Sequence, residues 1–190
     1  MGSVRRRGQQ VRIKLDADET GFLTALAQEL IARLSDGSSP EAADPQDPLA
    51  ALTGAFAEPV EPPADPILAR ILPDAYRDDA GAAAEFRRLT DSGLRTAKSR
   101  RLSHLVDMLA SGERSAGSAL RLDLDDAEVE EWLYTLTDIR LMFGTWIEAT
   151  EDLDEQRRAL EPGSKRYAEI EAYDWLASLQ ESLVHVLTGY

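Results

Sequence analysis

Apolar and basic side chains alternate in the stretch Val11-Arg12-Ile13-Lys14-Leu15. A period of two residues is typical of a strand that buries one of its faces. The alternation returns at Leu120-Arg121-Leu122-Asp123-Leu124. Because a single strand cannot satisfy its own backbone hydrogen bonds, we expect residues 11–15 and 120–124 to pair as a small two-stranded β ribbon. Two unrelated extended linkers are the alternative interpretation.

A helix start signal follows each alternating stretch. Asp16 with Glu19, and Asp125 with Glu128, have the spacing that resembles a capping box, in which each side chain bonds the backbone N–H of the other residue. After each pair, apolar residues recur every three or four positions, to about residue 35 in the first case and through Phe143 in the second. The sequence therefore predicts two units of strand, cap and helix.

Three further helical segments are expected. Asp65-Pro66 begins a short helix that Pro73 ends, because Asp caps a helix and Pro fits its first turn. Residues 81–110 form one long helix or two, with 91–93 as the break. A last helix is expected from about Lys165 to Thr188, with a wide apolar stripe that must be buried.

Two segments differ from this helical body. Residues 1–10 form a basic N-terminal arm, and residues 36–65 form a linker rich in Pro, Ala and acidic residues, in which only 48–52 looks like a brief helix. With 190 residues, the chain is long enough for one sizeable core. We therefore expect a single helical domain over 1–190. Its fold class is mainly α, a compact helical bundle with the small two-stranded β ribbon.

Composition excludes several kinds of protein. The chain has no cysteine, so disulfides, thiolate nucleophiles and zinc fingers are excluded. No apolar run approaches the roughly 18 residues that a membrane span needs. The basic start is not followed by the apolar segment of a secretory signal. We expect a cytoplasmic protein.

No catalytic constellation is recognisable. The two histidines, His104 and His185, stand outside any known ligand motif. The glycines match neither the Walker nor the dinucleotide-binding pattern, and no Gly-x-Ser-x-Gly elbow occurs. We expect a protein that is not an enzyme, with no catalytic residue, metal ligand or cofactor.

Basic residues gather in two places although the net charge is −14. Such a total charge repels a polyanion, so nucleic-acid binding requires a local basic patch. On a helical wheel Arg100 lies away from Arg95 and Lys98, and a solvated amphipathic helix is therefore the alternative interpretation of residues 95–101. The candidate nucleic-acid contacts are Arg95, Lys98, Arg100, Arg101, Arg12 and Lys14.

The last helix also carries a candidate interface. Its stripe contains Trp175, Leu179, Leu183 and Leu187. Core packing is the first explanation of such a stripe, but an exposed part of it would supply a partner surface or the twofold interface of a homodimer.

Four segments carry a resemblance to known proteins, residues 65–79, 85–89, 132–144 and 173–189. In this order they resemble one actinobacterial family, catalogued as a domain of unknown function, that includes the oxidative-stress transcriptional regulator AosR. The resemblance extends from about Val11 to the end of the chain and implies control of transcription under oxidant stress, without catalytic residues. A protein without cysteine cannot sense oxidant by forming a disulfide within itself.

The leading hypothesis is a transcriptional regulator that acts mainly through protein contacts, with RNA polymerase holoenzyme or a sigma factor, and makes auxiliary contacts to promoter DNA. A helix suited to reading bases is not evident in a chain of this charge. The alternative is a non-catalytic helical adaptor or scaffold that binds a client protein. Clustering of Arg12, Lys14 and residues 95–101 on one face would favour a role near DNA, and dispersion would favour the adaptor.

Overall fold

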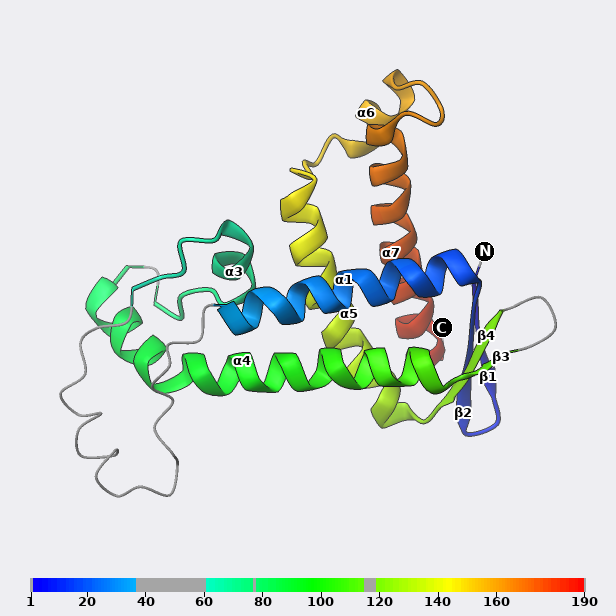
Figure 1. The fold of residues 1–190 in the computed structure, drawn as a ribbon, viewed down its shortest axis with the longest axis horizontal. Helices are drawn as coiled ribbons and strands as arrows, with labels where there is room; N and C mark the ends of the chain where they lie inside the picture. Colours follow the sequence, from blue (N-terminus) through cyan, green and yellow to red (C-terminus); the bar gives the residue numbers. More distant parts are fainter. Residues whose placement is uncertain (1, 37–60, 77, 115–118, 190) are drawn as a thin grey trace.

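A small antiparallel sheet closes one end of a helical body in the computed structural model of the chain (Figure 1). The structure describes residues 2–36, 61–76, 78–114 and 119–189. The strands are β1 (Ser3–Arg7), β2 (Gln10–Leu15), β3 (Glu113–Arg114) and β4 (Leu120–Leu124). The helices are α1 (Ala17–Asp36), α3 (Pro66–Ile71), α4 (Ala80–Ser111), α5 (Asp126–Trp146), α6 (Leu153–Ala159) and α7 (Lys165–Thr188).

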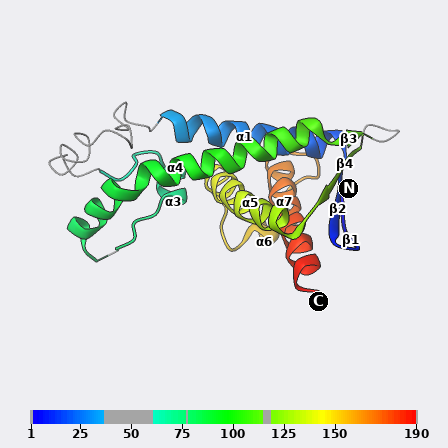
Figure 2. The ribbon, with the colours of Figure 1, turned by 90° about the horizontal axis from the view of Figure 1, so that it is seen from below.

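The helices form two layers. Figure 2 shows the long helices α1 and α4 side by side in one layer, with α5 and α7 in the layer beneath them. The mainly α fold class is confirmed.

The predicted pairing of residues 11–15 with 120–124 is confirmed. β2 and β4 are antiparallel, with Val11 opposite Leu124 and Leu15 opposite Leu120. The expectation of only two strands was wrong, because the sheet has four strands in the order β1-β2-β4-β3. β1 pairs with β2 through a turn at Gly8, and the short β3 pairs with β4 at the other edge of the sheet.

β1 lies inside the segment that we expected to be a basic arm, and its charge explains the error. Three consecutive arginines give residues 5–7 the composition of a tail. An edge strand, however, needs little apolar surface. Val4 packs against the core, and Arg6 forms an ion pair with Asp126 at the start of α5. The turn residue Gly8 has a φ of 64°, a conformation that suits glycine at the first central position of a two-residue hairpin turn.

The core lies between the sheet and the helices. β2 and β4 each bury every second side chain, and none of these six is more than 8% exposed. The helices meet them with leucine-rich faces that repeat every three or four residues. The strands contribute Val11, Ile13, Leu15, Leu120, Leu122 and Leu124, and the centre of the helical layers contributes Leu23, Leu30, Leu105, Leu109, Leu136, Ile139 and Leu183.

Both predicted capping boxes are present. In α5, Glu128 N donates to Asp125 Oδ1 at 2.9 Å, and Asp125 N donates to Glu128 Oε2 at 2.8 Å. In α1, Glu19 N donates to Asp16 Oδ1 at 2.9 Å, and Asp16 N donates to Glu19 Oε2 at 2.8 Å. These bonds satisfy N–H groups that a helix start leaves without an intrahelical partner.

The Glu19 carboxylate also accepts two hydrogen bonds from outside the capping box. Its Oε1 accepts from Gly2 N at 2.6 Å and from Trp175 Nε1 at 2.9 Å. One side chain therefore joins the start of β1, the cap of α1 and the middle of α7. An added Cβ at Gly2 would lie 2.7 Å from the Lys14 carbonyl oxygen, so this position favours glycine.

The remaining helices agree with the sequence with one exception. α7 has the predicted bounds, and α3 begins at Pro66 with Asp65 as its cap. α4 is a single helix, the first of the two predicted alternatives, and it continues through 91–93, where an ion pair joins Asp91 to Arg95. α6 was not predicted. The brief helix expected at 48–52 lies outside the described residues.

Replacing Glu19 tests its hydrogen bonds inside and outside the capping box. We expect Glu19→Ala to lower the free energy of unfolding by about 2–3 kcal/mol, because three donors lose a charged acceptor. Glu128→Ala is the matched control, since it removes the same capping bond without further partners, and should cost about 1 kcal/mol. The measurement is the midpoint of urea unfolding at unchanged slope. Equal losses in the two variants would contradict the bonds of Glu19 outside the capping box.

Candidate functional site

The sheet turns a charged face away from the helices. Residues paired across antiparallel strands share a face, so the register aligns Arg5 with Arg12, Arg12 with Asp123, and Lys14 with Arg121. We call this surface the basic sheet face. It consists of Arg5, Arg7, Arg12, Lys14, Glu113, Arg121 and Asp123.

Two of the five cations on this face are occupied by carboxylates. Arg12 holds Asp123 with both ends of its guanidinium, Nε to Oδ1 at 2.6 Å and Nη2 to Oδ2 at 2.9 Å. Arg121 forms an ion pair with Glu113 on the neighbouring strand. The hydrogen bond from Arg12 is the largest cause that lowers the pKa of Asp123, with smaller contributions from Arg121 and Arg7. The middle of the face and its β3 side are therefore close to neutral.

The other three cations are available to a partner. Arg5, Arg7 and Lys14 are exposed, and within the described part of the chain no ion pair occupies them. Two of them belong to β1, the edge strand. The unpaired positive charge of the basic sheet face thus lies beside the free edge of the sheet.

The basic set on α4 is largely engaged within the protein. Arg95 is 7% exposed, and it contacts Asp91 and the carbonyl oxygen of Leu34 on α1. Lys98 Nζ lies 2.7 Å from Asp138 Oδ1 on α5.

The two neighbouring arginines differ from each other. The Arg101 guanidinium stacks 5.4 Å from the ring centre of Tyr134, an arrangement typical of a cation–π contact. Arg100 has an exposed side chain. Of the four basic residues predicted on this helix, Arg100 is the one that offers a free charge.

The two predicted groups of cations do not share a face. Arg12 and Lys14 lie on the side of the sheet that points away from the helices, whereas α4 runs away from the opposite side of the sheet (Figure 1). Arg95 and Lys98 point into helix contacts. The charge map is dispersed, which is the arrangement expected of a protein-binding adaptor.

The stripe of α7 is mostly core. Leu179 and Leu183 are 6% and 0% exposed, and Leu187 is partly buried against the same cluster. Trp175 packs edge-on against Phe22 of α1 and donates its indole N–H to Glu19. These side chains have partners within the chain, in line with the core-packing explanation.

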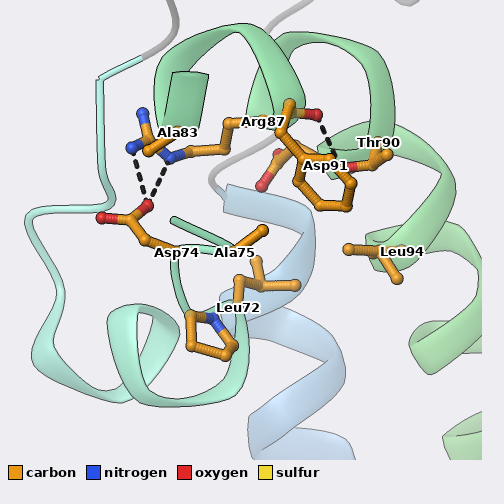
Figure 3. Close-up of a pocket in the computed structure, with 10 residues that line it drawn as sticks. Leu72, Asp74, Ala75, Ala83, Arg87, Thr90, Asp91 and Leu94 are labelled. Carbon is orange, nitrogen blue, oxygen red and sulfur yellow. Dashed lines mark hydrogen bonds and ion pairs between the residues drawn. The ribbon is translucent and has the colours of Figure 1, made fainter. Parts of the chain in front are cut away.

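A shallow surface hollow with a volume of only about 10 Å³ lies between α4 and the segment after α3 (Figure 3). Arg87 lies across it, and Asp74 Oδ1 accepts from its Nε at 3.0 Å and from its Nη2 at 2.7 Å. Among its lining residues, Phe86 and Leu94 expose apolar side chains. The hollow is smaller than most ligand sites. Of its charged residues, Arg87 and Asp74 bond each other, and Asp91 pairs with Arg95 outside the hollow.

Metal-binding clusters and membrane-spanning helices are both absent from the described ranges. These ranges contain no group of three or more His, Asp or Glu side chains able to hold a metal ion. No helix in them is both long and apolar enough to cross a membrane.

Sequence reasoning grouped Arg5 and Arg7 with a tail and passed over Arg121. The available signal for the hairpin is weak. Gly8-Gln9 directly precedes the alternating run 10–15, as a two-residue hairpin turn would, but Val4 is the single apolar residue in 3–7.

A family described as a domain of unknown function, DUF2017, matches residues 1–187. The chain belongs to this family. A relative named Oxidative stress regulator AosR, from Mycobacterium tuberculosis (strain ATCC 25618 / H37Rv), is 30% identical over 197 residues, which cover 97% of this chain and 85% of the relative. A Mycobacterium leprae (strain TN) protein named Putative oxidative stress regulator AosR is 28% identical over 193 residues, with 95% and 83% covered. No solved structure matches the chain.

The family resemblance found in the sequence is therefore confirmed. The relatives that match the chain are actinobacterial proteins named as regulators. The present member of DUF2017 contains no cysteine.

Lys98 and Arg100 provide a matched test of the basic segment on α4. We expect Lys98→Met to lower the free energy of unfolding by about 3 kcal/mol, because Asp138, whose side chain is 8% exposed, would lose its counter-charge. Arg100→Met should change it by less than about 0.5 kcal/mol. Urea unfolding measures both. In the double variant Lys98→Met/Asp138→Leu, most of the loss should be recovered, and an equal loss in the two single variants would contradict this assignment.

The pair between Arg12 and Asp123 predicts a pH dependence. The pKa of Asp123 is lowered in the folded protein, so its contribution to stability is complete above the unfolded pKa of about 3.9 and is lost as the pH falls through the folded value. Arg12→Gln should raise the pKa of Asp123 toward its usual range, as followed by carboxyl NMR. Lys14→Gln removes a charge from the same face without a bond to Asp123 and is the control. An unchanged titration in Arg12→Gln would disprove the pair.

Proposed function

We propose that this protein is a transcriptional regulator of the oxidative-stress response that acts in the cytoplasm, mainly through protein contacts with the transcription machinery. The observation that carries the proposal is the likeness to relatives named as oxidative stress regulators, which extends over 97% of the chain. A likeness over nearly the whole length favours a shared role for the whole fold. RNA polymerase holoenzyme and a sigma factor are the proposed partners.

Charge supports protein contacts over base reading. The net charge of −14 repels DNA. A recognition helix presents free polar side chains to the major groove, whereas Arg95 and Lys98 of α4 are engaged with α1 and α5.

Auxiliary contacts to promoter DNA are the smaller part of the proposal. They would come from two exposed residues of the predicted set, Lys14 on the basic sheet face and Arg100 on α4. Two phosphate contacts give a salt dependence of about sevenfold in affinity between about 50 and 150 mM salt. Binding of this kind anchors a complex that protein contacts have already assembled.

The second candidate function is a non-catalytic helical adaptor that binds a client protein. The observation that favours it is exposed apolar surface on α5 and α7. Tyr134, Trp146 and Val184 are 61%, 56% and 43% exposed. Aromatic side chains of this kind are common anchors of protein interfaces. A homodimer would use the same residues, because Leu179 and Leu183 are already buried.

The test is fluorescence anisotropy of labelled promoter DNA, titrated with this protein at about 50 and about 150 mM salt, with and without RNA polymerase holoenzyme. We expect weak binding by the protein alone that is lost at the higher salt. With holoenzyme present, the protein should alter the anisotropy at both salt concentrations.

Two results would overturn this model in different directions. Sequence-selective binding by the protein alone at the higher salt would make it a DNA reader. No effect on DNA or on holoenzyme would favour the adaptor.

A further inference from the structure

The outer edge of β1 offers backbone hydrogen-bonding groups to a partner. β1 is the first strand in the order β1-β2-β4-β3, so no strand from the described ranges lies beside one of its sides. The turn between Arg7 and Gln10 has two residues, which makes these two a hydrogen-bonded pair. Hydrogen-bonded pairs then alternate along the hairpin, and the backbone N–H and C=O of Val4 and Arg6 point outward.

We infer that the edge of β1 binds an extended acidic segment of a partner protein, which adds to the sheet as a fifth strand. This inference rests on the proposed function, because it names the chemistry of the partner in its protein contacts. Strand addition takes its affinity from main-chain hydrogen bonds and its specificity from alternate side chains.

The position of the free charges determines which peptide fits. Arg5 and Arg7 project from β1 on the basic sheet face, two residues apart, and both are exposed. Carboxylates at every second position of an added strand would lie directly across from them, at the distance of a cross-strand pair. Lys14 lies one strand further in, on the same face. Consecutive acidic residues would direct half of their charge to the opposite side of the sheet.

The opposite side of an added strand meets a different surface. Val4 and Arg6 point to that side, and Arg6 is already paired with Asp126. Figure 2 shows that the last turns of α7 continue past β1 on this side. Val184, in those turns, is 43% exposed. Apolar or hydroxyl side chains therefore suit the alternate positions of the partner strand.

A second copy of this chain is a poor occupant of the edge. Pairing of β1 with β1 of another copy would bring residues 5–7 of both chains together, and like charges on adjacent strands are unfavourable.

Nucleic acid is also disfavoured. A phosphate backbone requires positive charge spread along its path, but Asp123 and Glu113 neutralise the middle and the β3 side of this face. The free charge is confined to the strand edge and its neighbour.

The experiment uses the full chain and a fluorescein-labelled peptide of about nine residues that alternates Glu with Val and Thr. Binding is followed by anisotropy at about 150 mM salt. A second peptide has the same sequence with N-methylated amides at the Val and Thr positions, which in an antiparallel added strand lie opposite Val4 and Arg6 and donate to β1. It keeps the charge but cannot form the ladder. We expect binding of the first peptide and at least about tenfold weaker binding of the second.

Arginine-to-glutamine variants at two places distinguish binding at the edge of β1 from nonspecific attraction to positive charge. Arg5→Gln/Arg7→Gln should weaken binding of the alternating peptide about tenfold. Arg100→Gln, which removes an exposed charge from α4, should change it less than about twofold. Any of three results would overturn the inference. The N-methylated peptide could bind as well as the first, or Arg100→Gln could weaken binding as much as the double variant. Duplex DNA could also displace the peptide at a lower concentration than unlabelled peptide does.

Amide exchange gives a readout that does not depend on affinity. In the complex, NMR should show slower hydrogen exchange at the N–H groups of Val4 and Arg6, while those of Arg5 and Arg7 change little because β2 already holds them. Unchanged exchange at Val4 and Arg6 in a saturated complex would refute strand addition.

These results are independent of transcription. Peptide binding without any response of holoenzyme would retain the docking edge and reject the proposed function. A holoenzyme response that is unchanged in Arg5→Gln/Arg7→Gln would retain the proposed function and reject the edge of β1 as its docking site.

Discussion

The structure depends on the pairing of β2 with β4. These two strands come from distant parts of the chain, occupy the centre of the sheet and bury alternate side chains in one core. Each is followed almost immediately by a capped helix, so the pairing also fixes where α1 and α5 begin. The pairing of residues 11–15 with 120–124 thus fixes where one helix in each of the two layers of Figures 1 and 2 begins. A register shift of a single residue would turn the apolar side chains of one strand toward solvent.

Charge is distributed unevenly over this frame. The protein has a large acidic excess, yet many of its cations are used to join elements of the fold, as Lys98 joins α4 to α5 and Arg33 joins α1 to the cap of α3. A group of three exposed cations, Arg5, Arg7 and Lys14, lies near one strand edge. A long-range negative field with a small positive region favours partners that present carboxylates in a restricted geometry.

Local signals made much of the fold predictable from the sequence. The alternations at 11–15 and 120–124 and the two capping boxes are contained within short windows, and their elements were found with the correct pairing. β1 was missed because its arginines resemble a tail, and its pairing partner is defined only once β2 is recognised as a strand. β3, with two residues, is too short to produce a periodic signal.

The candidate site was less predictable, for a physical reason. Whether a basic residue is free depends on partners that are distant in the sequence. Lys98 is paired with Asp138, forty positions later, and Arg95 reaches a carbonyl group of α1. The contact between Asp91 and Arg95, one helical turn apart, was within reach of sequence reasoning.

The separation between β2 and β4 has a consequence for the growing chain. Residues 10–15 leave the ribosome well before residues 120–124, so Val11, Ile13 and Leu15 stay without their strand partner until β4 has been synthesised. At roughly 5–20 residues per second this interval lasts roughly 5–20 s. Completion of the sheet is a long-range event that closes late, whereas α1 can form early from local contacts. The strand β2 is therefore synthesised early in the fold and protected late.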